Sequence, residues 1–323
     1  MDAHFLTEIE IKQFKCFTDF KAAGFKRVNL IGGKNNIGKT AFMEACYINV
    51  YSNTINSMIS ALYHIKFARE NLNFLHEFIA GNNPQIYDIK ILDATKNYVA
   101  KSNVSDKLFF VEKKDGIKEY KFAIDGKFTI VNSNEFSIIF EASSNIALID
   151  NFGWTDDELI NAFQTIQKQD LEKTLNDYVR EFDESIESFK VIGEKPQCKT
   201  NGEYRDITEF GDGLKHYISI ICALYACENG YLFIDEIDNG IHYSQLNRLW
   251  EIIFTLSKKT NCQIFATTHS KEMLESFARV AKKQAEQDIS YTTLVKNKDQ
   301  EIKALTQNSE MLFYSLAQEH EVR

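Results

Sequence analysis

Alternating and periodic apolar positions divide the start of the chain into short strands and a helix. Glu8–Phe14 alternates apolar and charged residues, which predicts a strand, and Val28–Ile31 is a short apolar run typical of a buried strand. From Lys39 onward the apolar residues recur at helical spacing (Phe42, Met43, Cys46, Tyr47 and Val50). The sequence therefore predicts a strand, a glycine-rich loop and a helix in succession.

The middle of the chain, residues 87–150, has a different pattern. Short segments rich in β-formers are separated by Asp115-Gly116, Asp125-Gly126 and Asn132-Ser133-Asn134, which are typical of hairpin turns. These segments are Lys107–Glu112, Glu119–Ile124, Lys127–Val131 and Phe136–Phe140. The pattern predicts an antiparallel β lobe.

Residues 151–195 predict a short helical insert. Thr155 followed three residues later by Glu158 is the pattern of a capping box at a helix start. The apolar residues of Thr155–Glu187 then form one stripe, which we expect to pack on the body of the protein or on a partner. The segment is too short for a long coiled-coil arm.

Apolar runs return in residues 196–323. Leu214–Cys227 is almost wholly apolar, which predicts a buried helix that Gly230 ends, and Tyr231–Ile234 and Gln263–Thr267 are typical of central parallel strands. A helix from Ser270 to about Lys283 is predicted next. Two hairpin strands and a closing helix complete the predicted order (Tyr291–Lys296, Glu301–Leu305 and the residues after them).

The glycine-rich loop Gly33–Thr40 reads Gly-Lys-Asn-Asn-Ile-Gly-Lys-Thr, which matches the phosphate-loop pattern G-x-x-x-x-G-K-[ST] between a strand and a helix. Its glycines let backbone N–H groups turn toward a phosphate at the positive end of the following helix. We expect Lys39 to bridge the β- and γ-phosphates and the Thr40 hydroxyl to bind Mg²⁺. The predicted ATP and Mg²⁺ site comprises Gly33, Asn35, Asn36, Gly38, Lys39, Thr40 and Ala41.

Two strand ends downstream carry candidate catalytic residues. Asp235 ends an apolar strand, so its carboxylate is expected to reach Mg²⁺ through water, and the adjacent Glu236 is the candidate general base. His269 leaves another apolar strand in the sequence Thr-Thr-His-Ser and is the candidate sensor of the γ-phosphate. Alone, these residues would be an ordinary acidic strand end and a structural histidine; the phosphate loop favours the catalytic interpretation.

A second anion site is predicted at the start of the buried helix. Gly211, Asp212 and Gly213 precede this helix, whose N-terminus attracts anions. In a head-to-tail dimer they would cap the γ-phosphate held by the other subunit, with Lys215 contributing and Asp238 at the dimer seam. A simple glycine-rich helix start is the alternative.

Composition limits the classes of partner. The net charge of −9 argues against a uniformly basic nucleic-acid clamp, so DNA binding stays possible but is not indicated by charge. The six cysteines are scattered without C-x-x-C spacing, and several lie in apolar runs, which indicates buried reduced thiols. The N-terminus has no signal pattern and no apolar run spans a membrane, so we expect a cytoplasmic protein without a membrane partner.

Together these segments resemble ABC-type ATPases of the RecF/SMC/OLD group, near the stand-alone bacterial ATPases named AAA. The resemblance is carried by Ile9–Phe17, Asp235–His242, Thr268-His269-Ser270 and the closing Glu321-Val322-Arg323. It implies an α/β fold, a P-loop ABC-type ATPase head with a mixed sheet and helices on both faces. The two halves of the head would be residues 1–86 and 196–323, with the β lobe at 87–150 and the helical insert at 151–195.

The resemblance further implies homodimerisation on ATP binding, slow hydrolysis and a role in phage defence or DNA maintenance. Too few residues follow His269 for a C-terminal nuclease, so an effector is expected to be a separate protein. The sequence departs from the pattern in two respects. Gly211 stands where ABC proteins usually carry serine, and no magnesium-binding glutamine follows Thr40 clearly, Gln85 being the candidate.

Two other functions compete with this interpretation, and two more are disfavoured. A RecF-like repair ATPase would bind DNA directly, and a non-hydrolysing scaffold would only be gated by ATP. A GTPase is disfavoured because Asn297-Lys298-Asp299-Gln300 only approaches the base-reading motif of that class, and a transporter ATPase would show the full Leu-Ser-Gly-Gly-Gln signature.

Overall fold

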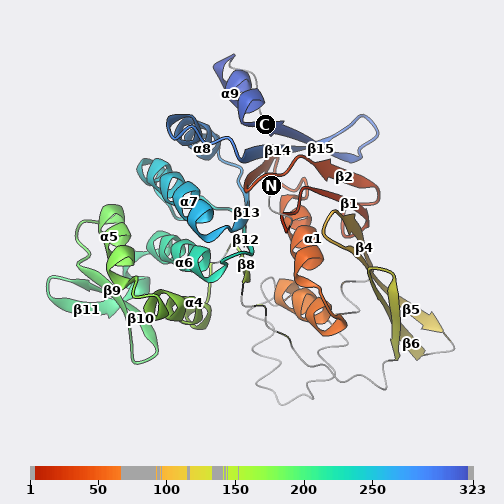
Figure 1. The fold of residues 1–323 in the computed structure, drawn as a ribbon, viewed down its shortest axis with the longest axis horizontal. Helices are drawn as coiled ribbons and strands as arrows, with labels where there is room; N and C mark the ends of the chain where they lie inside the picture. Colours follow the sequence, from red (N-terminus) through yellow and green to blue (C-terminus); the bar gives the residue numbers. More distant parts are fainter. Residues whose placement is uncertain are drawn as a thin grey trace. The chain divides into compact units, whose positions relative to one another are not determined.

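The computed structural model describes residues 4–66, 92, 95, 97–114, 117–132, 141, 143, 145–151 and 153–318 (Figure 1). The chain divides into two compact units, each assembled from separate segments: Met1–Phe25, Lys34–Ser143 and Thr293–Thr306 in the first, and Lys26–Gly33, Ser144–Thr292 and Gln307–Arg323 in the second. The domain boundaries at 86 and 195 stay predictions. Gln85, Phe136–Phe140 and Glu321–Arg323 lie outside the described residues.

An antiparallel sheet forms most of the first unit. Its strand order is β2-β1-β4-β5-β6-β7, with β1 at Glu8–Gln13, β2 at Phe20–Ala23, β4 at Asn97–Ser102, β5 at Asp106–Lys114, β6 at Ile117–Ile124 and β7 at Lys127–Asn132. Helix α1 (Lys39–Tyr51) belongs to the same unit, and residues 55–66 are also helical. The Tyr98 hydroxyl of β4 donates a hydrogen bond to the Ala45 carbonyl of α1 (2.7 Å), which ties the helix to the sheet.

The antiparallel pairing predicted for the middle of the chain is confirmed for β5, β6 and β7. These strands are not a separate sheet, however, because β4 pairs with β1 and so joins them to the N-terminal strands. The prediction of an antiparallel lobe up to residue 150 was wrong at its end. Ile146–Ile149 forms β8, which pairs parallel with β12 (Tyr231–Ile234) in the second unit.

The second unit is an α/β structure around parallel strands, as predicted. Strand β3 (Val28–Gly33) pairs parallel with β13 (Gln263–Thr267), which pairs parallel with β12, and β14 (Ile289–Lys296) lies on the other side of β3. Helices α6 (Asp212–Ala226), α7 (Leu246–Thr260) and α8 (Lys271–Lys283) pack one against the next beside these strands (Figure 1). Helix α6 is buried over most of its length and ends at Cys227, before the predicted Gly230. Strand β15 (Ile302–Asn308) and helix α9 (Ser309–Ala317) follow β14 in the chain.

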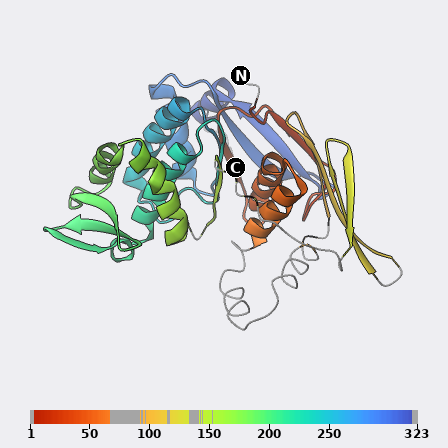
Figure 2. The same ribbon diagram turned by 60° about the horizontal axis from the view of Figure 1, so that its bottom comes forward.

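The helical insert contains two helices. The capping box of Thr155 and Glu158 starts α4 (Asp156–Lys168), as predicted, but the backbone turns at Asp170 (φ 54°) before α5 (Glu172–Phe182) begins. The apolar stripe is buried against the body of the second unit, α4 lying against α6. A three-stranded antiparallel sheet that the sequence pattern did not reveal follows: β9 (Ser188–Ile192), β10 (Lys195–Thr200) and β11 (Glu203–Asp206) (Figure 2).

The sequence also led to predictions about membrane-spanning segments and about the cysteines. Within the described ranges, no helix is long and apolar enough to cross a membrane. All six cysteines lie in those ranges and are free thiols; five are buried as predicted, but Cys16 is exposed.

Candidate nucleotide site

Three parallel strands of the second unit end at the same edge of the sheet. Ile31 of β3 pairs with Thr267 of β13, and Ala266 of β13 pairs with Ile234 of β12. The Thr268 N–H then donates to the Ile31 carbonyl (3.0 Å), so the pairing continues to the last residues. Gly33, Thr268 and Asp235 therefore leave the sheet at its carboxyl edge, the position at which ligands bind to α/β sheets.

The phosphate loop continues directly from Gly33 and leads into α1. Gly38, the N-cap residue, has φ 105° and no side-chain hydrogen bond caps the helix, whose first turn contains no acidic residue. A Cβ atom at Gly38 would lie 2.8 Å from Cys16 Sγ, so only glycine fits there. Lys39 is buried and its ammonium group donates to the Lys34 carbonyl (3.3 Å) across the loop. The loop geometry suits an anion at the start of α1.

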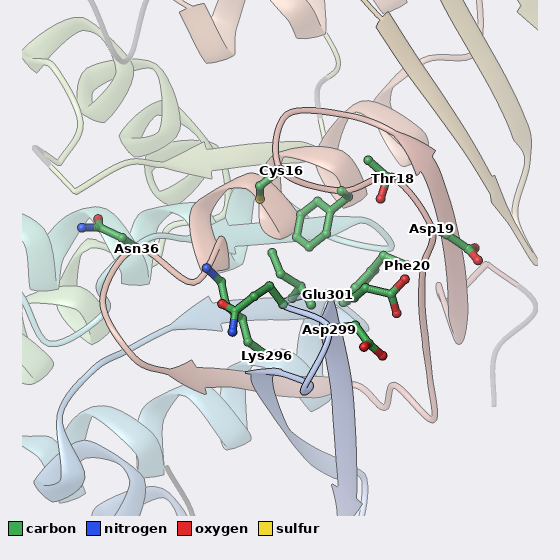
Figure 3. Close-up of a pocket in the computed structure, with 11 residues that line it drawn as sticks. Cys16, Thr18, Asp19, Phe20, Asn36, Lys296, Asp299 and Glu301 are labelled. Carbon is green, nitrogen blue, oxygen red and sulfur yellow. The ribbon is translucent and has the colours of Figure 1, made fainter.

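A hollow of about 350 Å³, which we call the loop pocket, lies beside the phosphate loop in the first unit (Figure 3). Asn36 of the phosphate loop lines it, together with residues of the β1–β2 loop and of the turn between β14 and β15: Cys16, Phe17, Thr18, Asp19, Phe20, Lys296, Asp299, Gln300, Glu301 and Ile302. Apolar rings and carboxylate acceptors are suited to a purine ring that carries an amino group. The turn contains the Asn297–Gln300 segment that only approaches a guanine-reading motif.

Thr267 holds the two acidic residues that follow β12. Its hydroxyl donates to the Asp235 carboxylate (2.5 Å) and accepts from the Glu236 N–H (2.8 Å). Glu236 has φ 51°, a left-handed conformation that costs a non-glycine residue free energy and persists because the surroundings impose it. Asp235 is buried, whereas Glu236 is partly exposed. The two carboxylates therefore have different surroundings, as metal binding and proton transfer require.

Glu236 and His269, the candidate general base and the candidate phosphate sensor, lie close to each other. His269 Nδ1 is 3.8 Å from Glu236 Oε1, and the two side chains are 50% and 41% exposed. His269 stands in the loop between β13 and α8, which is fixed because Ser270 caps α8 by accepting from the Met273 N–H (3.1 Å). The pair is open to a ligand and to water.

The predicted seam residues are close to one another within the second unit. The Thr268 hydroxyl donates to the Asp238 carboxylate (2.6 Å). A Cβ atom at Gly213 would lie only 1.9 Å from the Gly240 carbonyl oxygen, so the start of α6 and the turn after β12 touch through their backbones. Gly211 has φ 84°, and among the described residues no atom lies within 4 Å of the position that a Cβ atom would take there. Asp212 begins α6, and Lys215 forms an ion pair with Asp156 (2.6 Å).

Sequence reasoning assigned no role to Thr267, Asp156 or His216. Thr267 stood in a segment that was recognised, but only the register of β13 against β12 shows what its hydroxyl contacts. His216 of α6 is buried, its Nε2 has no hydrogen-bond partner among the residues that the structure describes, and burial lowers its pKa to about 4. In the sequence, His216 could have been noticed as an isolated polar residue within an apolar helix.

Residues 139–274, which include β12, β13 and the helices between them, match the family model described as AAA ATPase domain. Solved SMC head domains share the α/β fold over nearly the whole chain. Together these findings define the class of protein as far as a domain and a fold: residues 139–274 are similar to an AAA ATPase domain, and the chain shares the α/β fold of SMC heads, in line with the resemblance to the ABC-type RecF/SMC group.

The individual relatives are distant. A protein of Helicobacter pylori named ATP/GTP phosphatase is 26% identical over 96% of this chain and 97% of its own length. An SMC head bound to the C-terminal winged-helix domain of ScpA has a TM-score of 0.54 at 13% identity, covering 95% of this chain and 99% of that one. A Pyrococcus furiosus Smc head bound to the C-terminal domain of ScpA has a TM-score of 0.51 at 10% identity, covering 97% and 99%. The two structures establish the fold.

Proposed function

We propose that this ATPase is an ATP-gated switch. Two copies join head to tail around ATP and Mg²⁺, and the ATP-bound homodimer acts on a separate effector protein. The observation that carries the proposal is that Glu236 and His269 lie together at the sheet edge from which β3 continues into the phosphate loop. An acid–base pair at that edge is suited to the attack of water on a terminal phosphate.

Each residue of the proposed site has one role. The phosphates would be bound by the Lys39 ammonium group and by the backbone of Gly33, Asn35, Asn36, Gly38 and Ala41. The Thr40 hydroxyl would bind Mg²⁺ directly, and the Asp235 carboxylate would hold it through water. Magnesium, when bound, neutralises charge on the phosphate oxygens. Glu236 takes the proton of the attacking water and His269 holds that water in line.

The second copy completes the site. The start of its α6, with Gly211, Asp212, Gly213 and Lys215, would cap the γ-phosphate, and Asp238 would lie at the seam. Glycine at position 211 leaves this cap without a serine hydroxyl, which is consistent with slow turnover. Since the cap is absent from a single copy, hydrolysis would require the dimer.

Two comparisons extend the proposal. The name of the Helicobacter pylori relative, ATP/GTP phosphatase, supports GTP as a second substrate, and the carboxylates of the loop pocket are acceptors for the amino group of either purine. The SMC heads bound to ScpA domains support a protein partner for the ATPase head. Phage defence or DNA maintenance is the process that the family resemblance favours.

Light scattering of the Glu236→Gln protein tests the switch. Without the general base, ATP and Mg²⁺ should convert this variant from monomer to dimer and keep it there, because hydrolysis no longer releases the two copies. Glu228→Gln, which changes an exposed glutamate at the opposite end of β12, is the matched control and should not trap the dimer. Adding Lys39→Ala to Glu236→Gln should abolish the shift by removing phosphate binding.

Two other outcomes would favour the competing functions. A Glu236→Gln protein that keeps one oligomeric state with and without ATP would contradict the proposed switch and favour a non-hydrolysing scaffold. A monomeric protein that hydrolyses ATP faster on addition of duplex DNA would favour a RecF-like enzyme that binds DNA directly.

A further inference from the structure

The start of α6 is connected to the helical insert by one ion pair. Lys215, in the first turns of α6, places its Nζ 2.6 Å from Oδ1 of Asp156, the first residue of α4. The two side chains are 21% and 39% exposed, so the pair lies at the surface and a ligand can reach it. Helices α4 and α6 lie against each other in the second unit (Figure 1). The proposed phosphate cap therefore has a carboxylate partner in its own chain.

The start of α6 carries charges of both signs, because Asp212 is its first residue and Lys215 follows three residues later. Side chains of a helix lean toward its N-terminus, so the Lys215 ammonium group lies on the side of α6 where an approaching phosphate would arrive. Among the described residues, no side chain forms a capping hydrogen bond at this N-terminus, and no atom lies within 4 Å of the position that a Cβ atom of Gly211 would take. The Asp156 carboxylate thus holds the cation that the proposed cap would use.

We propose that Asp156 is a latch on Lys215. In the free subunit it holds the lysine, and in the dimer it gives the lysine up to the γ-phosphate of the nucleotide bound to the second copy. The exchange is favourable because a terminal phosphate carries more negative charge and more acceptor oxygens than a carboxylate. A pair this exposed holds only weakly, so ATP can break it.

The ion pair would also allow a partner protein to influence the proposed phosphate cap. Asp156 begins α4, which leads through α5 into the three-stranded sheet of β9, β10 and β11 (Figure 2). A protein that docks on this insert and shifts the start of α4 would change how firmly Lys215 is held. The inference rests on the proposed function and identifies Asp156 as a residue that regulates it.

The test uses the full chain with Glu236→Gln and measures, by light scattering, the ATP concentration that produces half of the dimer. Asp156→Asn should lower this concentration about two- to fivefold, the effect of removing one half-exposed ion pair. Asp157→Asn is the matched control: it removes a carboxylate from the same first turn of α4 and should change nothing. Lys215→Gln should raise this ATP concentration more than about tenfold, since it removes a charged phosphate contact. Lys215→Arg keeps the positive charge and should restore most of the dimerisation that Lys215→Gln loses.

The combined variant separates a latch from a structural ion pair. With Lys215→Gln present, Asp156→Asn should have no further effect on dimerisation. The latch is overturned if Asp156→Asn behaves like Asp157→Asn, or if it weakens dimerisation as Lys215→Gln does. A parent Glu236→Gln protein that never dimerises overturns both the latch and the proposed function, whereas a parent that dimerises with unresponsive Asp156→Asn overturns the latch alone.

Discussion

Thr267 and Asp235 are joined across two parallel strands, because the threonine hydroxyl at the end of β13 donates to the carboxylate at the end of β12. The same hydroxyl accepts from the Glu236 N–H. One side chain therefore orients the candidate metal ligand and fixes the backbone of the candidate base. This relationship has a direct consequence for catalysis.

Thr267→Val keeps the shape of the side chain and removes both hydrogen bonds. We expect the rate of ATP hydrolysis to fall by about 10- to 100-fold, because Asp235 and Glu236 lose the group that orients them. The unfolding free energy should fall by about 1–3 kcal/mol, since the Asp235 carboxylate and the Glu236 N–H lose a partner. Steady-state kinetics and denaturant unfolding measure the two effects. Thr267→Ser, which keeps the hydroxyl, should retain most of the hydrolysis rate and most of the unfolding free energy. Equal losses in the serine and valine variants would contradict the prediction.

His216 should make the protein sensitive to acid. Burial lowers its pKa to about 4, so below about pH 6.5 the unfolded chain binds the proton before the folded chain does. Stability from neutral His216 is therefore fully present above pH 6.5 and falls by about 3 kcal/mol as the pH drops to 4. His216→Gln should flatten the pH dependence of the unfolding free energy in this window, whereas the exposed His242→Gln should not. Identical curves for both variants would refute the assignment.

Gly213→Ala should destabilise the protein although the position is helical. Its new carbon would lie 1.9 Å from the Gly240 carbonyl oxygen, and a backbone atom cannot rotate away. We expect a loss of about 1–3 kcal/mol of unfolding free energy from this overpacking. Gly211→Ala meets no atom of the described residues within 4 Å and is opposed only by its φ of 84°, which costs about 1 kcal/mol. Thermal unfolding compares the two, and a more stable Gly213→Ala protein would show that the two backbones are not in contact.

Lys15 and Glu44 form an ion pair that joins the β1–β2 loop to α1, and the Glu44 side chain is only 4% exposed. Lys15→Met leaves this buried carboxylate without the lysine, so we expect a loss of about 1–3 kcal/mol of unfolding free energy, reduced from the fully buried case because Lys15 is 30% exposed. Adding Glu44→Gln should recover part of the loss. Lys12→Met removes an exposed pair with Glu10 and serves as the control. Additive losses in the double variant would show that the two residues are not coupled.

Cys16 should be the thiol that a maleimide modifies in the native protein. It is exposed in the loop pocket, whereas the other five cysteines are buried. Partial burial raises its pKa, so modification should be slow at neutral pH and accelerate as the pH rises toward and past 9. Mass spectrometry should find one adduct in the protein and none in Cys16→Ser. If the loop pocket takes the base, ATP with Mg²⁺ should slow the reaction; unchanged labelling would place the base elsewhere.

The sequence by itself determined the elements that depend on local pattern. Apolar runs identified the parallel strands β3, β12 and β13, and a phosphate-loop motif between a strand and a helix identified the start of the site. The capping box at Thr155 placed the start of α4 because its hydrogen bonds join residues three positions apart. Local interactions of this kind can be recognised from a single sequence.

Tertiary structure decided what depends on pairing between distant segments. Only the register of the sheets shows that β4 joins β1, that β8 lies beside β12 and that Thr267 contacts Asp235. The close approach of Gly213 to Gly240 and the ion pair of Lys215 with Asp156 likewise arise where α6 packs against its neighbours. Periodicity reports which side of an element is buried but not which partner covers it, and so the sequence predicted the site's chemistry while the fold decided its contacts.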